Sequence, residues 1–403
     1  MIDIAIGFSS ENNSLLAAEE AVGQAKTRLK SRSKIDLGLV FHSFDLSAPT
    51  IAKTLSEHLE DIPLIGAAGA ALMCDRGVYK HGLTVMLLGF PEGVYCSTAV
   101  ARNIHEKNPF LGGKELAEHL LYGFKNIQRN FGFLLFDRLV EEATSFVSGL
   151  QEHLGRGFPC FGTSASSYAD VSKASLYYNS EVLTDGCVGI RGGGKVSFGL
   201  GLQHGWRPIG KPHLVTSSVG NIVSAVDGKP ALGLYEDYLG LSGSRLTREL
   251  RKLSASYPIG LLIPGEQEYL LRNVISVDER GALFCQGNIP EGATVRLMIS
   301  TKETCLEAAS RALAEAKENL ANAMPKIAKV MPSRFAIVFS SFSRYNLLRR
   351  DIKEELSLIK KSLPGIPIIG LFTQGELAPL NAGAYHGQIY FHNQDFSVLI
   401  IEG

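Results

Sequence analysis

The sequence predicts a mixed α/β protein in which one strand–helix–strand unit recurs three times, at residues 35–69, 131–165 and 335–375. Each copy opens with an apolar run that ends in Phe and a small or polar residue. It continues with a helical pattern and closes on an apolar residue, Pro, two further residues and Gly. Repeats of a solenoid follow one another directly, whereas these copies are separated by other elements. We therefore interpret them as duplicated α/β units.

Apolar residues three and four positions apart indicate the helix of the unit, at 51–59 in the first copy and 352–359 in the third. Ser47 and Pro49 are typical of a helix start. A strand–helix–strand connection implies parallel pairing through a right-handed crossover, which places the Pro-X-X-Gly turn at one end of the sheet. Open α/β sheets bind ligands at that end.

A further strand and helix precede each copy, and a hairpin-like strand follows it. The preceding pairs are 2–6 with 15–22, 96–101 with 116–122, and 294–298 with 306–316, and the following strands are 83–88, 186–190 and 396–401. Residues 197–299 hold different material, short β-type runs between Gly, Pro and Asp turns. We therefore expect β-α-β-α-β units with hairpin tails, forming mixed sheets flanked by helices, in two pseudo-duplicated domains at 1–219 and 220–403.

Composition limits the classes of partner. A chain of 403 residues fits two domains. Its 40 Lys and Arg balance 40 Asp and Glu, and no basic run longer than Arg349-Arg350 stands out, so a nucleic-acid partner is not expected. The longest uncharged apolar stretch, 62–74, is shorter than the roughly 20 residues of a membrane span, and the N-terminus lacks the basic region of a signal peptide. We expect a cytoplasmic protein without a membrane partner.

The cysteines are scattered without CxxC spacing, in mostly apolar, strand-like contexts. Buried free thiols are the expected state, and neither a zinc site nor a disulfide framework is predicted. The six are Cys74, Cys96, Cys160, Cys187, Cys285 and Cys305.

The central stretch carries a family resemblance. Residues 204–210, 220–223 and 227–240 resemble the join between the N-terminal and C-terminal halves of FIST-domain proteins. Further C-terminal matches are 271–274, 290–295, Phe339-Ser340 with Arg344, 370–376 and Phe391-His392-Asn393. The resemblance covers nearly the whole chain. It implies a bacterial-type intracellular sensory domain that binds small ligands, with amino acids as candidates, and that is often joined to signalling output domains.

The chain departs from the family pattern at three places. Gly66–Ala70 is polar-free where the family usually has a Gly-Cys-Ser-type loop, Ser341 replaces a Cys, and Asp395 stands where a Thr is expected. No segment is left over for a kinase, cyclase or receptor output. We therefore expect the signal to pass to a separate output protein.

A candidate ligand site lies at the sheet end of the third copy. Arg344 follows its first strand, and Thr373, Gln374, Gly375 and Glu376 follow its second. An Arg fork binds a carboxylate at two points and a Glu accepts an ammonium group, so together they suit a zwitterion such as an amino acid. The alternative is that Arg344 and Glu376 pair with each other.

Three further positions complete the candidate set: Arg272 and Asn393, which match the family motif, and Ser341, which stands where the family has a Cys. Arg272 lies on a predicted strand, where a paired or snorkelling side chain is the alternative. His386 and His392 could ligate a metal or haem, although no third ligand is suitably spaced, and a surface or hydrogen-bonded histidine is the alternative. The only tryptophan, Trp206, is expected to anchor packing at the domain junction.

Enzyme motifs are mostly missing. Gly192–Gly194 is not followed by a helical pattern, which argues against a dinucleotide or P-loop site. Residues 162–166, with Ser164, resemble a nucleophile elbow but lack its final Gly and any triad partners, so a turn is the simpler interpretation. The sequence therefore predicts a non-catalytic sensor that needs no cofactor. A haem-binding gas sensor, a ligand-free interaction scaffold and a weak hydrolase remain alternatives.

Overall fold

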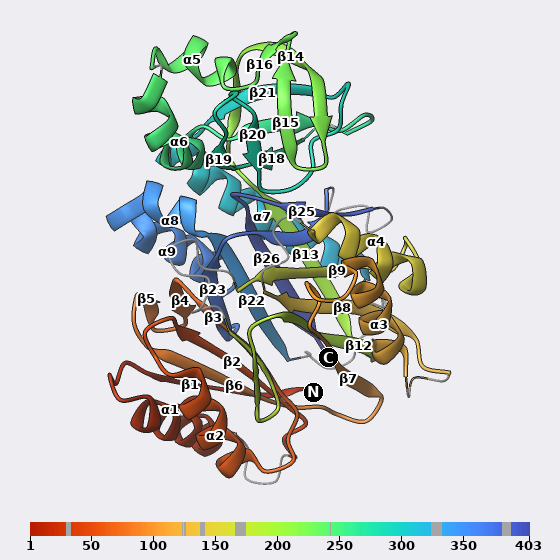
Figure 1. Ribbon diagram of the computed structural model, residues 1–403. Coiled ribbons are helices and arrows are strands. Elements are labelled where there is room, and N and C mark those ends of the chain that lie inside the picture. The colour runs from red at the N-terminus through yellow and green to blue at the C-terminus, as the bar shows by residue number, and fades with distance from the viewer. Residues whose placement is uncertain are drawn as a thin grey trace.

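A computed structural model describes residues 1–29, 34–122, 124, 126–137, 142–165, 175–241, 243–266, 268–323, 333–380 and 388–403. It confirms the mixed α/β class and the three strand–helix–strand units (Figure 1). In each unit the two strands that flank the central helix pair in parallel: β2 with β3, β8 with β9, and β22 with β23.

Each unit contributes four strands of its own to one sheet. The first has β1 (Asp3–Ser9), α1 (Ser14–Arg28), β2 (Leu37–Ser43), α2 (Ala48–Leu59), β3 (Leu64–Gly69) and β6 (Leu83–Gly89). The second has β7 (Val94–Arg102), α3 (Pro109–Leu121), β8 (Arg129–Phe136), α4 (Ala143–Leu154), β9 (Cys160–Ser164) and β12 (Gly186–Gly194). The third has β13 (Ser197–Gln203), α7 (Lys302–Ala323), β22 (Arg334–Ser341), α9 (Ile352–Ser362), β23 (Ile368–Thr373) and β26 (Phe396–Glu402). The short α8 (Phe342–Leu348) and a 3-10 turn at Arg349–Asp351 join β22 to α9.

A hairpin from another unit completes each sheet. The hairpins are β4 (Ala71–Cys74) with β5 (Gly77–Tyr79), β10 (Leu176–Tyr178) with β11 (Glu181–Leu183), and β24 (Glu376–Pro379) with β25 (Ile389–His392). The hairpin of the first unit pairs with β23, that of the second with β3, and that of the third with β9. The exchange is therefore cyclic, and a hydrogen bond of 3.1 Å from the Ile2 N–H to the Gly403 carbonyl joins the two chain ends.

The central strands are apolar on both faces, which explains their continuous apolar runs. One face packs on the helices of its own unit, as Val40 does beneath α1 and α2. The other face meets the other two sheets in a shared core, where the rings of Phe133 and Phe339 stack with centroids 5.9 Å apart. Phe41 packs edge-on against Phe339 at 5.9 Å. The Phe that ends two of the apolar runs thus fixes the three-sheet core.

One expectation about the third unit is wrong. Residues 294–298 were expected to be its first strand, but β21 (Thr294–Ile299) belongs to a different sheet, and β13 pairs with β26 as β1 pairs with β6. The physical cause is an insertion between β13 and α7, which separates the first strand of the unit from its helix. The boundary expected at Gly220 falls in the turn between two paired strands of this insertion, β14 (Arg207–Val219) and β15 (Ile222–Val226).

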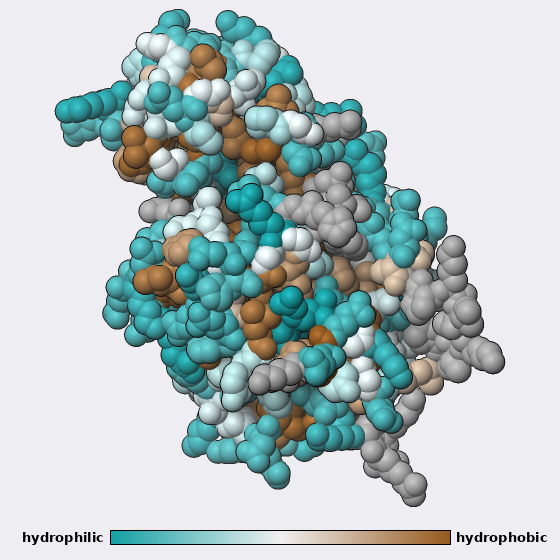
Figure 2. All heavy atoms as spheres, turned by 90° about the vertical axis from the view of Figure 1, so that its right-hand side faces the viewer, coloured by the Kyte–Doolittle hydropathy of each residue, from teal (hydrophilic) through white to brown (hydrophobic). Residues whose placement is uncertain are grey.

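The inserted domain forms a second lobe with its own core (Figures 1 and 2). Besides β14, β15 and β21 it contains β16 (Lys229–Pro230), α5 (Gly233–Leu239), α6 (Gly243–Ser256), β17 (Ile259–Leu262), β18 (Tyr269–Arg272), β19 (Val274–Val277) and β20 (Leu283–Cys285). Trp206 is buried at the entrance to this lobe and its indole N–H donates to the Ser256 carbonyl at 3.3 Å, so the expected anchor at the junction is confirmed.

Five of the six cysteines are buried, Cys96 is partly buried, and all six are free. Within the described part of the chain, no helix has both the length and the apolar character needed to cross a membrane.

Close approach between strand and helix predicts a large effect at Gly201. A Cβ on Gly201 would lie 1.8 Å from the carbonyl oxygen of Ala312 on α7, as one on the equivalent Gly7 would lie 1.8 Å from that of Ala21 on α1. We expect Gly201→Ala to lower the free energy of unfolding by about 3 kcal/mol because backbone must move. Gly23→Ala, in α1 with nothing within 4 Å, should instead stabilise by about 0.5–1 kcal/mol. Urea midpoints measure both, and equal midpoints would contradict the close approach.

Candidate functional site

A cleft opens where the third sheet ends beneath the inserted domain. Its volume is about 670 Å³, and it lies between α6 and β19 on one side and the ends of β22 and β23 on the other. Ser341, Thr373, Gln374 and Asn273 line it with polar groups, and Arg248, Arg251 and Lys252 of α6 add positive charge. This volume falls in the range of small-molecule sites.

The parallel register of the third unit brings Ser341 and Thr373 side by side, because they are paired positions of β22 and β23. Ser341 also caps α8, and its hydroxyl accepts the Ser343 N–H at 3.2 Å. The Thr373 hydroxyl donates to Glu376 at 3.1 Å. Gln374 follows directly, and its Oε1 is buried without a hydrogen-bond partner among the described residues. Of the three polar residues that this strand end gives to the cleft, Gln374 therefore carries a polar atom that is left unused.

Glu376 lies behind the cleft wall and is fully buried. Burial raises the pKa of its carboxyl well above the usual value, and the nearby Asp395 carboxylate raises it further. Its Oε2 has no hydrogen-bond partner in the described part of the chain. The raised pKa favours the neutral form of the carboxyl, which makes Glu376 a poor counter-charge for an ammonium group.

Arg344 is also fully buried, and it pairs with Glu355 of α9 rather than with Glu376. Its Nη2 lies 2.6 Å from a Glu355 carboxylate oxygen, and its guanidinium also donates to the carbonyls of His204 and Cys305, each at 2.9 Å. These contacts turn the guanidinium toward α9 and α7, and Arg344 does not line the cleft.

Arg272 and Asn393 belong to a buried polar layer between the two lobes. Arg272 donates to the Phe391 carbonyl at 2.8 Å, and burial lowers the pKa of its guanidinium to about 10. The Asn393 Oδ1 accepts the Asn273 N–H at 3.0 Å, and Gln286 of the inserted domain donates to the Gln374 carbonyl at 2.7 Å. The inserted domain is thus hydrogen-bonded to the loop that carries Gln374.

Gly375 holds the same loop on the second sheet. Its carbonyl accepts the Thr163 hydroxyl at 3.0 Å and the Ser164 N–H at 2.9 Å. A Cβ here would lie 2.3 Å from the Phe391 ring. Of the predicted ligand residues, the structure therefore brings Ser341, Thr373 and Gln374 together in the cleft, and places the other five in the structure behind it.

Sequence reasoning missed the cleft cations Arg248, Arg251 and Lys252, and it did not include Asn273 in the site. A signal was present for the cations, because all three lie in one stretch of five residues, 248–252. Nothing in the sequence indicated that α6 would face the end of β23.

The histidines expected as alternative metal or haem ligands do not form a described site. His386 lies outside the described residues. His392 is buried, with Nε2 3.0 Å from the Ala378 carbonyl oxygen and Nδ1 3.3 Å from an Asp395 carboxylate oxygen. Among the residues with described positions, no group of three or more His, Cys, Asp or Glu could hold a metal ion.

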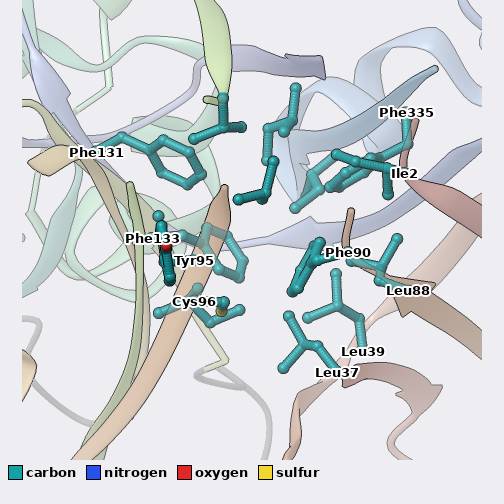
Figure 3. Close-up of a pocket in the computed structure, with 16 residues that line it drawn as sticks. Ile2, Leu37, Leu39, Leu88, Phe90, Tyr95, Cys96, Phe131, Phe133 and Phe335 are labelled. Carbon is teal, nitrogen blue, oxygen red and sulfur yellow. The ribbon is translucent and has the colours of Figure 1, made fainter. Parts of the chain in front are cut away.

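A second candidate, a cavity inside the three-sheet core, is lined by apolar side chains from all three units (Figure 3). Its volume is only about 30 Å³. Apolar cavities of this kind stay dry and have no group to orient a polar ligand. We assign it to core packing.

The comparisons with known proteins identify the family. Residues 36–229 match the FIST N domain and residues 231–379 match the FIST C domain. An uncharacterized protein of Mycobacterium tuberculosis strain H37Rv is 29% identical over 258 residues, 62% of this chain and 65% of the relative, so the match spans less than two thirds of that relative's length. An uncharacterized protein of Mycobacterium bovis is 24% identical over 401 residues, 95% of this chain and 96% of the relative.

Among solved structures, a cyanuric acid hydrolase from A. caulinodans aligns over 100% of this chain and 99% of its own, with 9% identity and a TM-score of 0.33. A likeness at that level carries no argument about activity. The two domain matches together cover most of the chain, with the second beginning inside the inserted domain. The chain belongs to the FIST family of sensory and signal-transduction domains.

Proposed function

We propose that this protein is a non-catalytic sensor that binds a small polar ligand, with amino acids as the first candidates, in the cleft between the inserted domain and the third sheet. The observation that carries the proposal is Gln374, which lines a cleft of about 670 Å³ together with Ser341 and Thr373 and whose buried Oε1 has no hydrogen-bond partner in the described part of the chain. A buried polar atom without a partner is costly, and a bound ligand would satisfy it.

The side chains of the cleft that could bind an amino acid differ from those predicted from the sequence. The side chains of Arg248, Arg251 and Lys252 would attract the ligand carboxylate, in place of Arg344. The ammonium group would donate to Gln374 Oε1 and the neighbouring hydroxyl, in place of Glu376. Amide oxygens and hydroxyls accept such bonds without the cost of a buried charge.

The buried polar layer supplies a route for the signal. Gln286 and Asn273 of the inserted domain bond to the Gln374 loop and to Asn393, so a ligand that draws on Gln374 also acts on the contact between the lobes. A ligand can shift an equilibrium between two relative positions of the lobes only by the difference in its affinity for those two positions. We infer that a separate output protein reads the lobe position.

A thermal-shift screen against amino acids and common small metabolites tests the proposal. A ligand present at a hundred times its Kd should stabilise the wild-type protein by about 2.7 kcal/mol. We expect Gln374→Ala to abolish most of that shift, while Gln128→Ala, an exposed position outside the cleft, keeps it. No shift with any compound, or an equal shift in both variants, would refute binding at this site and favour the scaffold alternative.

A further inference from the structure

A second, larger cavity adjoins the cleft and has a different character. Its volume is about 1020 Å³, and it shares Lys252, Ala255, Ser343 and Asn346 with the cleft. It extends away from the strand ends along α8 toward the start of α7. Ser341, Thr373 and Gln374, the polar residues of the cleft proposed to bind the amino acid, do not line this cavity.

Positive charge is concentrated in this cavity although the chain is neutral overall. Among the residues whose positions the structure describes, five cations line it and no carboxylate does: Lys80, Lys252, Lys302, Arg349 and Arg350. They come from four segments far apart in the sequence, the end of β5, α6, α7 and the turn after α8. Folding therefore brings together positive charges that no basic run in the sequence predicts.

Most of these cations have no acidic partner among the described residues. Lys302 is paired with Asp351. Within the described part of the chain, Lys80, Lys252, Arg349 and Arg350 form no ion pair, and all four are exposed at the cavity. Gathering like charges costs free energy unless an anion offsets it, and a concave wall of one sign raises the local concentration of oppositely charged ligands.

An aromatic platform lies among the cations. Tyr345 stacks on Phe342 with ring centroids 5.6 Å apart and an interplanar angle of 10°, and its edge-to-face contact with Phe372 at 5.0 Å fixes it from beneath. The Lys80 ammonium lies 5.8 Å from the Tyr345 ring centre. The cavity thus combines an aromatic ring held by its neighbours with exposed cationic side chains.

We propose that this cavity binds a small molecule carrying two or more phosphate groups. Arg and Lys side chains from separate segments can surround the several oxygens of such a ligand, and Arg matches phosphate geometry in two-point fashion. The volume fits a molecule of nucleotide size, and the face of Tyr345 would suit a ring attached to the phosphates. The assignment does not depend on the amino-acid proposal, because Lys252 is the only side chain named there that also lines this cavity.

Isothermal titration calorimetry with inorganic pyrophosphate, ADP and adenosine at low ionic strength tests it. We expect pyrophosphate and ADP to bind, adenosine to bind far more weakly, and added salt to weaken the binding. The double variant Lys80→Ala/Arg350→Ala should lose about tenfold or more in affinity. Both positions are exposed, so the variant should keep the wild-type urea midpoint.

The matched control is Lys229→Ala/Arg156→Ala, which removes one exposed Lys and one exposed Arg away from the cavity and should bind as the wild type does. Equal affinity in the two double variants would mean an adventitious ion only and would overturn the proposal. So would the absence of any binding, or displacement of ADP by a single-stranded oligonucleotide at far lower concentrations than by pyrophosphate. Pyrophosphate binding that persists in Gln374→Ala would support the phosphate site even if the thermal-shift screen finds no amino-acid binding in the cleft.

Discussion

Arg344→Met is expected to lower the free energy of unfolding by about 3–5 kcal/mol, because it leaves the Glu355 carboxylate buried without its counter-charge. Arg344 and Glu355 are both fully buried, and 2.6 Å separates their charged atoms. The substitution also leaves the carbonyls of His204 and Cys305 without a donor. Urea unfolding followed by the fluorescence of Trp206, the only tryptophan, measures the loss.

The same experiment separates a structural Arg344 from a ligand-binding one. Arg350→Met removes an exposed arginine and should leave the midpoint nearly unchanged. The double variant Arg344→Met/Glu355→Leu should recover a large part of the stability, since apolar residues replace buried ion pairs at little cost. If Arg344→Met unfolds at the same urea concentration as Arg350→Met, the buried pair contributes nothing and our account of Arg344 fails.

Glu376→Gln is expected to gain stability over the wild type as pH rises from 5 to 7. Burial raises the folded-state pKa of Glu376 well above its usual value, so above about pH 4.5 the unfolded state releases a proton that the folded state retains. Wild-type stability then falls with rising pH by up to about 1.4 kcal/mol per pH unit from this group, and the loss continues until pH reaches the folded-state pKa. A glutamine keeps the shape of the neutral acid and does not titrate.

The measurement is the difference in urea midpoint between Glu376→Gln and wild type at pH 5, 6 and 7. Glu354→Gln, at an exposed position of α9, should show no such trend. A difference for Glu376→Gln that stays constant across this range would mean that the carboxyl is ionised in the folded state. That result would restore Glu376 as a possible counter-charge for an ammonium group.

The sequence predicted the features set by local pattern. The parallel strand–helix–strand units and the start of α2 after Ser47 follow from periodicity and crossover geometry. The partner of Arg344 was also within reach. Glu355 lies three residues after Ile352 and four before Ile359, on the apolar face of α9, and a carboxylate there requires a buried cation.

Other features depend on distant parts of the chain and leave no local mark. The short link between β23 and β24 does not reveal that β24 crosses to the second sheet, because a strand carries no sign of which edge it will join. The insertion hid the fact that β13 is the first strand of the third unit, as β1 is of the first, since the helix that follows β13 in the unit begins only at Lys302. The basic cavity likewise draws its cations from four separate segments.

The cyclic exchange of hairpins also sets the order in which the molecule can be finished during its synthesis. The hairpin β4–β5 leaves the ribosome long before its partner β23, because the whole inserted domain lies between them in the chain. Until then the nascent chain exposes unpaired strand edges, which are sites of aggregation. β26 closes the third sheet between β13 and β22, so a chain that stops before Phe396 lacks the strand that joins them. A truncation between β25 and β26 should therefore be as damaging as one before β22.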